Sequence, residues 1–328
     1  MSTLPYVDAA AMARLAPPKL AVAALEDALR GGLDPELDSP RLFAPLEAGE
    51  FLLMPAQSAH YAGIKVATVA PGNPAKGHPK IQGTYLLLDR ETLTPLAAMD
   101  GAELTLIRTP AVTTLAIKHL LAARAGRAGT VPTGAGLSAG NVAVLGTSLQ
   151  ADRHIAALHS VCGIEALTVI GRRAGAAGEL ARKWSGLGIP ARVGTPGDVA
   201  GADVVVCATS SAVPVFDGTL VRDDAVVAAI GSHGLDAHEV DPTLARRAAV
   251  VVEGRASALR EAGDLIPARS AAEWEQAGLA TLSELVNGHF DPAPGTPLLY
   301  TGVGMSWEDI VVAGRVYELF GGSTPPVN

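Results

Sequence analysis

Between residues 141 and 252 the chain alternates short, mostly apolar runs with helix-length segments. The apolar runs are 141–146, 166–171, 191–193, 203–208, 225–230 and 248–252, and helices are expected at 149–162 and 174–187. Continuous apolar runs are typical of parallel strands that are buried on both faces, with helices as the crossovers between them. We therefore predict an α/β fold whose C-terminal half is a doubly wound parallel sheet.

The N-terminal part follows a different pattern. One helix is expected over residues 9–31, and extended segments are expected at 51–54, 63–70, 83–89 and 95–100. The last two segments flank Arg90-Glu91-Thr92, which favours an antiparallel hairpin. Residues 103–125 and 306–320 are expected to be helical, and the final helix need not belong to the parallel sheet. We therefore predict two domains, a mixed N-terminal one and a doubly wound one.

Composition excludes several classes of protein. Hydrophobic residues make up 48% and charged residues 18% of the 328 residues, which excludes a disordered chain. The net charge of −8 argues against a nucleic-acid or acidic-membrane partner, because phosphate binding needs clustered basic charge. With only Cys162 and Cys207, and without a histidine cluster, no disulfide framework or metal site is expected. Since no uncharged apolar run reaches about 18 residues, and charges interrupt the N-terminal apolar stretches, we expect a cytoplasmic protein.

A small-residue turn connects the first buried strand to its helix. A dinucleotide-binding turn requires a first Gly for the tight turn, a second for close approach to the pyrophosphate, and a third Gly or Ala for packing. Gly146 and Ala151 fit the first and third places, while Ser148 stands at the second. Gly146, Ser148, Leu149 and Gln150 are therefore candidate contacts to a dinucleotide at a helix N-terminus. The alternative is an ordinary tight turn between a strand and a helix.

Two arginines follow the second strand. The residue that contacts the adenosine ribose of a bound dinucleotide usually lies here and is usually acidic. Arg172 and Arg173 occupy the position instead, and arginine pairs bidentately with phosphate. NADP(H) is therefore predicted in preference to NAD(H). A solvated basic pair at a strand end is the alternative.

Small and hydroxylated residues follow another apolar strand. Ala208 is the last residue of the run 203–208, and Thr209 and Ser210 follow it directly. They are expected at the carboxyl edge, where such sheets bind ligands. Their hydroxyl groups can contact a pyrophosphate or ribose, although they can equally cap a helix. These three residues are included among the candidate cofactor contacts.

Several blocks of sequence resemble, in order and over nearly the whole chain, the ornithine cyclodeaminase/mu-crystallin family. The blocks are Gly63–Lys65, Asp100-Gly101, Leu104–Thr109, Gly146–Ala151, Cys207–Ser211, Ile230–Ser232, Glu239–Asp241 and Gly302–Asp309. The resemblance implies a homodimer that binds a small imino or amino acid and NAD(H) or NADP(H). It also implies a substrate-binding and dimerisation domain of residues 1–118 and 305–328, and a Rossmann-type dinucleotide-binding domain of residues 119–304.

The resemblance assigns roles to individual residues. Arg41 is similar to the family arginine that binds the substrate carboxylate, Lys65 to the lysine beside the reacting carbon, and Arg108 to a second carboxylate-binding arginine. The chemistry agrees, because arginine fixes a planar carboxylate and a buried lysine with a lowered pKa can exchange a proton. Met54 is expected in the substrate pocket, and the expected cofactor contacts are Thr84, Thr109 and Val303.

One departure bears on the reaction. Cyclodeaminases of this family carry an aspartate where this chain has His233. The departure lowers the expectation of a cyclodeaminase and favours simple reduction, with Lys65 or His233 keeping the imine nitrogen protonated. We therefore predict an NAD(P)H-dependent reductase of a 2-imino acid, such as pyrroline- or piperideine-2-carboxylate. An ornithine cyclodeaminase, an alanine-type dehydrogenase and a non-catalytic cofactor-binding protein are the alternatives.

Overall fold

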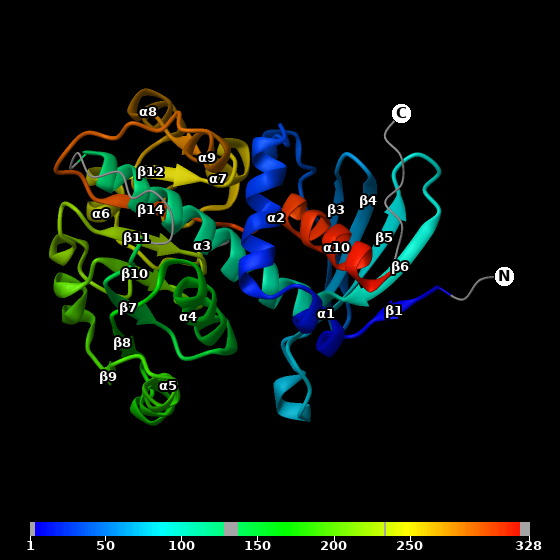
Figure 1. Ribbon diagram of the computed structural model, residues 1–328, viewed down its shortest axis with the longest axis horizontal. Coiled ribbons are helices and arrows are strands. Elements are labelled where there is room, and N and C mark those ends of the chain that lie inside the picture. Colours follow the sequence, from blue (N-terminus) through cyan, green and yellow to red (C-terminus); the bar gives the residue numbers. More distant parts are fainter. Residues whose placement is uncertain (1–3, 128–136, 233, 322–328) are drawn as a thin grey trace. The chain divides into compact units, whose positions relative to one another are not determined.

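The computed structural model describes residues 4–127, 137–232 and 234–321, and the chain divides into two compact units (Figure 1). The first unit consists of residues 1–109 and 305–328, and the second of residues 110–304. The division passes through helix α3 (Gly101–Arg127), which begins in the first unit.

The first unit contains a six-stranded sheet in the order β1-β6-β5-β4-β3-β2. Its strands are β1 (Tyr6–Val7), β2 (Leu42–Leu46), β3 (Gly49–Gln57), β4 (Tyr61–Val69), β5 (Ile81–Asp89) and β6 (Pro95–Asp100). Neighbours from β2 to β6 are antiparallel, so the predicted hairpin of β5 and β6 is confirmed, and only the β1 pairing is parallel. Helix α10 (Ser306–Phe320) packs on β3, β4 and β5 of this sheet.

The predicted single helix over residues 9–31 is wrong. The structure has α1 (Ala9–Leu15) and α2 (Pro18–Arg30) instead. Asp8 Oδ1 caps α1 by accepting the N–H of Ala11 at 2.8 Å. Pro17 disfavours the helical conformation in the residue before it, and Pro18 suits the first turn of a new helix. The helix is therefore interrupted between Leu15 and Pro18.

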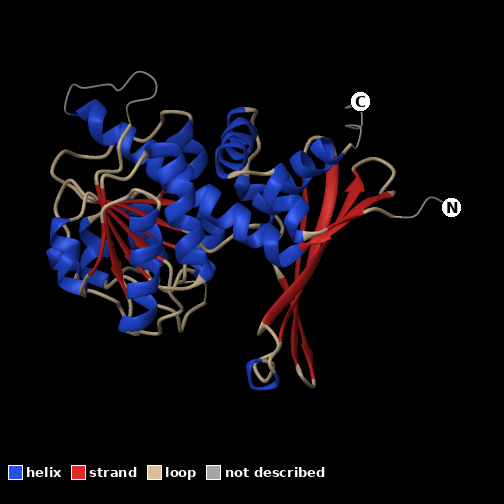
Figure 2. Ribbon diagram, turned by 60° about the horizontal axis from the view of Figure 1, so that its bottom comes forward, coloured by secondary structure: helices blue, strands red, loops and turns tan. Residues whose placement is uncertain are grey.

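The second unit is an eight-stranded sheet in the order β13-β12-β14-β11-β10-β7-β8-β9. Its strands are β7 (Asn141–Leu145), β8 (Ala166–Ile170), β9 (Ala191–Val193), β10 (Val204–Cys207), β11 (Val226–Ala229), β12 (Ala249–Val252), β13 (Ala280–Thr281) and β14 (Leu298–Thr301). Its helices are α4 (Leu149–Cys162), α5 (Ala174–Gly186), α6 (Pro242–Arg247), α7 (Arg255–Glu261), α8 (Ala271–Ala277) and α9 (Leu282–Val286). Every pair of neighbouring strands is parallel, and helices lie on both sides of the strands (Figure 2). The predicted doubly wound parallel sheet is confirmed.

The strand order places a switch point beside β7. The chain proceeds from β7 outward to β8 and β9, and then returns to form β10 on the other side of β7. In open α/β sheets, ligands bind at the carboxyl ends of the strands where the order reverses. The loops after β7 and β10 therefore flank the expected ligand-binding crevice. Within the described residues, no helix is long and apolar enough to cross a lipid bilayer.

Candidate active site

Lys65 lies in a row of buried side chains that crosses the sheet of the first unit. Strand β4 buries alternate residues, and Lys65 is on the buried face. Its cross-strand neighbours are Met54 on β3 and Tyr85 on β5, and Tyr85 in turn pairs with Met99 on β6. All four side chains are at most 3% exposed. The amino group is thus held in an otherwise apolar layer, and burial lowers the pKa of Lys65 to about 8.

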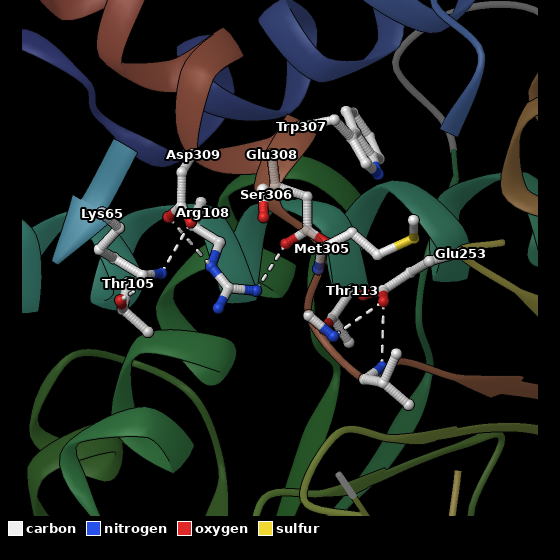
Figure 3. A network of polar contacts seen from close by, with 12 residues as sticks. Lys65, Thr105, Arg108, Thr113, Glu253, Met305, Ser306, Trp307, Glu308 and Asp309 are labelled. Carbon is white, nitrogen blue, oxygen red and sulfur yellow. Dashed lines mark hydrogen bonds and ion pairs between the residues drawn. The ribbon is translucent and has the colours of Figure 1, made fainter. Parts of the chain in front are cut away.

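Two carboxylates at the start of α10 hold two cations of the first unit (Figure 3). Lys65 Nζ donates to Asp309 Oδ2 at 2.7 Å and to Thr105 Oγ1 at 3.3 Å. Arg108 Nη1 donates to Glu308 Oε2 at 2.7 Å, and Arg108 Nε lies 3.5 Å from Asp309 Oδ1. Both acidic residues are fully buried. The structure therefore brings Lys65 and Arg108, both predicted site residues, together against the first turn of α10.

Asp38 fixes the position of that helical turn. Its Oδ2 accepts the N–H groups of Ser306 at 2.7 Å and Trp307 at 3.1 Å, which caps the N-terminus of α10. Burial raises the pKa of Asp38 to about 7; the two N–H groups oppose this rise, and the charges of Glu308 and Asp309 add to it. Arg41 is three residues farther along, so an extended chain keeps its Cα within about 11 Å of that of Asp38.

The charges of this cluster balance. Lys65 and Arg108 are cations, and Glu308 and Asp309 are anions, so their ion pairs offset the cost of burying four charges. The hydroxyl of Tyr85 and the indole Nε1 of Trp307 are buried and have no hydrogen-bond partner within the described residues. Buried polar groups normally have partners, so these atoms are candidates to bind a ligand. The arrangement can hold a zwitterion and exchange a proton near neutral pH.

The turn after β7 in the second unit has the geometry that a dinucleotide requires. Gly146 has a φ of +128°, and a Cβ there would collide with the carbonyl oxygen of Ala208. Ser148 caps the 14-residue helix α4, with its Oγ 3.5 Å from the N–H of Ala151. Close backbone approach and a helix N-terminus are what a pyrophosphate needs, so the turn fits NAD(P).

The other candidate cofactor residues of the second unit follow three parallel strands of the same sheet, β8, β10 and β14. Arg172 and Arg173 are exposed after β8, and the loop after β10 contains buried Ala208, half-buried Thr209 and exposed Ser210. Val303 is buried after β14, and its N–H donates to Glu253 Oε2 at 3.0 Å. Because these strands are parallel, their carboxyl ends lie at one edge of the sheet. Exposed Leu149 and half-buried Gln150 begin α4 at the same edge.

Two predicted cofactor residues are placed outside these two groups. Thr84 is exposed on β5, and Thr109 is half-buried on α3, both in the first unit. His233 lies outside the described residues, so its predicted role stays a prediction. Its neighbour Ser232 is fully buried, with its Oγ 3.4 Å from Thr301 Oγ1.

Sequence reasoning did not assign roles to Asp38, Thr105, Glu308 or Asp309. The adjacent acids Glu308 and Asp309 were a usable signal, because they occupy buried positions in the first turn of a mostly apolar helix. Asp38 lies in a loop rich in acidic residues and gave no such signal. Within the parts of the chain that the structure describes, no group of three or more His, Cys, Asp or Glu side chains could hold a metal ion.

Comparison with known proteins gives consistent similarities. Residues 18–323 match the ornithine cyclodeaminase/mu-crystallin family. A delta(1)-pyrroline-2-carboxylate/delta(1)-piperideine-2-carboxylate reductase of Azospirillum brasilense is 33% identical over 314 residues, which cover 94% of each chain. A probable ornithine cyclodeaminase from Bordetella pertussis has a solved structure that is 29% identical, with a TM-score of 0.83 and coverage of 99% of this chain and 100% of that one. An archaeal alanine dehydrogenase dimer with bound NAD is 26% identical, with a TM-score of 0.81 and coverage of 96% and 95%.

Proposed function

This chain belongs to the ornithine cyclodeaminase/mu-crystallin family, and we propose that it is an NAD(P)H-dependent reductase of a cyclic 2-imino acid such as pyrroline- or piperideine-2-carboxylate. The observation that carries the proposal is the buried contact of Lys65 and Arg108 with the first turn of α10. It provides a proton donor and a carboxylate-binding cation in one buried cluster. The 33% identity to the Azospirillum reductase supports the same reaction.

The substrate carboxylate is held by arginine. Arg108 and Arg41 present guanidinium groups, whose planar donors match the two oxygens of a carboxylate. A protonated cyclic imino acid is a zwitterion, and the cluster of Lys65, Arg108, Glu308 and Asp309 also has no net charge when all four are ionised. Binding therefore adds no uncompensated charge to a buried site. Met54, the cross-strand neighbour of Lys65 on β3, contacts the apolar part of the substrate in this proposal.

Lys65 supplies the proton of the reaction. During reduction the imine carbon of the protonated imino acid accepts a hydride and the C=N double bond becomes a single bond, which leaves a neutral amine nitrogen that accepts a proton from Lys65 Nζ. Lys65 is left neutral and regains its proton before the next turnover. A pKa of about 8 suits this role, because a general acid works best when its pKa is close to the working pH. His233 is the alternative proton donor.

The second unit holds the cofactor, which supplies the hydride when it is bound. Gly146, Ser148, Leu149 and Gln150 receive the pyrophosphate at the N-terminus of α4. The remaining contacts are the loop Ala208–Ser210, Val303, and Thr84 and Thr109 of the first unit. Arg172 and Arg173 are exposed at the ribose position, which supports a preference for NADP(H) over NAD(H).

The active form is a homodimer that uses the first unit. This unit has a cavity of about 1260 Å³, which is lined by helices α2 and α10 and by the connection between β3 and β4. The edge strand β2 exposes Leu42, Phe43 and Leu46, each by at least 46%. An exposed apolar edge strand invites pairing with another chain. The dimeric state of the similar archaeal alanine dehydrogenase supports the assignment.

Assays with defined substrates test the proposed function. The purified protein is mixed with NADPH or NADH and pyrroline-2-carboxylate or piperideine-2-carboxylate, and cofactor oxidation is followed by absorbance. We expect stoichiometric oxidation of the cofactor and formation of proline or pipecolate. Conversion of ornithine to proline and ammonia with catalytic NAD would instead establish a cyclodeaminase, to which the 29% identity with the Bordetella protein points. Preferential interconversion of alanine and pyruvate would establish an alanine dehydrogenase.

A further inference from the structure

Glu239 accepts four hydrogen bonds from two loops at the carboxyl edge of the parallel sheet. Its Oε1 accepts the N–H of Thr209 at 2.6 Å and the hydroxyl of Thr209 at 2.7 Å. Its Oε2 accepts the N–H groups of Ile230 at 2.9 Å and Gly231 at 2.6 Å. Thr209 follows β10, whereas Ile230 and Gly231 follow β11. One fully buried carboxylate therefore joins the ends of two neighbouring strands.

The position of Glu239 is itself fixed by a second carboxylate. Asp264 Oδ1 accepts the N–H of Glu239 at 2.7 Å and that of Val240 at 3.0 Å. The two strand-end loops are also packed tightly against each other, because a Cβ on Gly231 would collide with the carbonyl oxygen of Thr209. Backbone, glycine and two buried acids thus specify a single arrangement of the loops.

We propose that Glu239 is a positioning residue, which fixes the loop after β10 in its cofactor-binding arrangement before the cofactor arrives. The inference rests on the proposed function, since it takes Ala208, Thr209 and Ser210 as cofactor contacts. Preorganised loops lose less conformational freedom on binding, and this raises affinity. Glu239 acts through Thr209 and does not itself contact the cofactor.

Glu239 needs both of its carboxylate oxygens for this role, because each of them accepts two hydrogen bonds. Glutamine keeps the shape of the side chain but replaces one acceptor oxygen with an NH₂ group, which only donates. In Glu239→Gln, either the pair of donors on Thr209 or the pair from Ile230 and Gly231 loses its acceptor. The two loops are then no longer held together by one side chain.

Asp203 provides a matched control at the opposite edge of the same sheet. It precedes β10, and its Oδ2 accepts the backbone N–H of Asn141, which begins β7, at 2.8 Å. Asp203→Asn therefore makes the same chemical change to a carboxylate that links two strands, but at their amino ends, and it also removes the ion pair of Asp203 with Arg222.

The test measures cofactor binding apart from turnover. Dissociation constants of NADPH and NADH are determined by nicotinamide fluorescence for the unmodified protein, Glu239→Gln, Glu239→Asp and Asp203→Asn. We expect Glu239→Gln to weaken binding of the preferred cofactor about tenfold and to raise its KM, with the KM of the imino acid changed less than about twofold. Glu239→Asp, which keeps both acceptors, should recover part of the affinity, and Asp203→Asn should stay within about twofold. Unchanged affinity in Glu239→Gln, or an equal loss in Asp203→Asn, would overturn the inference.

Hydrogen exchange keeps the inference testable should Glu239→Gln fail to fold. In the unmodified protein without cofactor, the amides of Thr209 and Gly231 should already exchange slowly, whereas the N–H of Ile230 also donates to the carbonyl oxygen of Cys207 and is not used. Exchange as fast as that of exposed loop amides would show that the loops are not preorganised. The dissociation constants and the hydrogen exchange are both measured without the imino acid, so an absence of imine reduction would reject the proposed function while leaving the positioning role of Glu239 intact.

Discussion

Lys65 and Asp309 form a buried ion pair of 2.7 Å although 244 residues separate them in the chain. Several effects set the proton affinity of Lys65, of which three are the largest. Burial is the largest and lowers its pKa, the charge of Asp309 raises it, and the nearby charge of Arg108 lowers it. The result is a pKa of about 8, so this amino group changes charge close to physiological pH.

The pH dependence of reduction follows from this value. Lys65 carries its proton below pH 8 and loses it above, so the proton donor disappears as the pH rises. We expect kcat/KM for the imino acid to fall about tenfold for each pH unit above about 8. Steady-state rates measured in buffers of constant ionic strength between about pH 6 and pH 10 check this. A profile that stays level to about pH 10 would exclude Lys65 as the proton donor.

Replacement of Asp309 should move that profile. Asp309→Asn removes a charge that raises the pKa of Lys65, so the fall in kcat/KM should begin at lower pH. The variant also leaves a buried lysine without its carboxylate, which typically costs about 3–5 kcal/mol of stability. Rates across the pH range and thermal unfolding measure the two effects. Asp198→Asn is the control for the profile, because it removes a carboxylate that pairs with Arg192 and caps a short helix at Thr195, and it should leave the pH profile unchanged. An unshifted profile in Asp309→Asn would separate Asp309 from the proton transfer.

Cofactor preference depends on the two arginines after β8. Replacing both Arg172 and Arg173 by Ala should weaken NADPH binding more than NADH binding, because only NADPH carries the 2′-phosphate. A well-formed hydrogen bond to a charged group contributes about 1.5–3 kcal/mol, so the expected loss is at least tenfold. Affinities of both cofactors for the variant and the unmodified protein give the comparison. Equal affinities of the unmodified protein for the two cofactors would contradict the assignment.

Arg41 is expected to require its guanidinium geometry as well as its charge. Arg41→Lys keeps the positive charge but loses the planar pair of donors that a carboxylate matches. We expect kcat/KM for the imino acid to fall, mainly through KM, with cofactor binding unchanged. Steady-state kinetics with the best substrate measure this. Wild-type kinetics in the variant would place Arg41 outside the substrate site.

The parallel sheet could be predicted from the sequence because its strands are buried on both faces. Runs such as Asn141–Leu145 and Val204–Cys207 contain almost no polar residue, so their pattern identifies them directly. The edge strand Leu42–Leu46 was missed because it is largely exposed and contains a proline. Leu298–Thr301 was missed because four residues after a Pro- and Gly-rich segment give too short a pattern.

The candidate site was predictable only in part, for a physical reason. Resemblance to a family assigned roles to Lys65 and Arg108, but it assigned none to the acidic residues that bind them. An ion pair depends on which elements pack together, and the position of α10 against β4 is a property of the folded chain. Asp38 shows the same limit, since its backbone partners Ser306 and Trp307 lie 268 and 269 residues away.

Asp38 should also make the stability of the protein depend on pH. Its folded-state pKa is about 7, above the ordinary value of 3.8, so between these values the folded chain binds more protons at this position than the unfolded chain. The contribution of Asp38 to the free energy of unfolding should therefore decrease as the pH rises from about 4 to about 7. Asp38→Asn keeps an oxygen that can cap α10 but removes the charge. The free energy of unfolding of this variant should therefore not show this decrease, and the variant should become more stable than the unmodified protein as the pH rises. Asp38→Ala removes the cap as well and should be destabilised by about 1 kcal/mol at every pH relative to Asp38→Asn. Denaturant unfolding of the three proteins at several pH values checks these expectations, and parallel pH profiles for Asp38→Asn and the unmodified protein would contradict them.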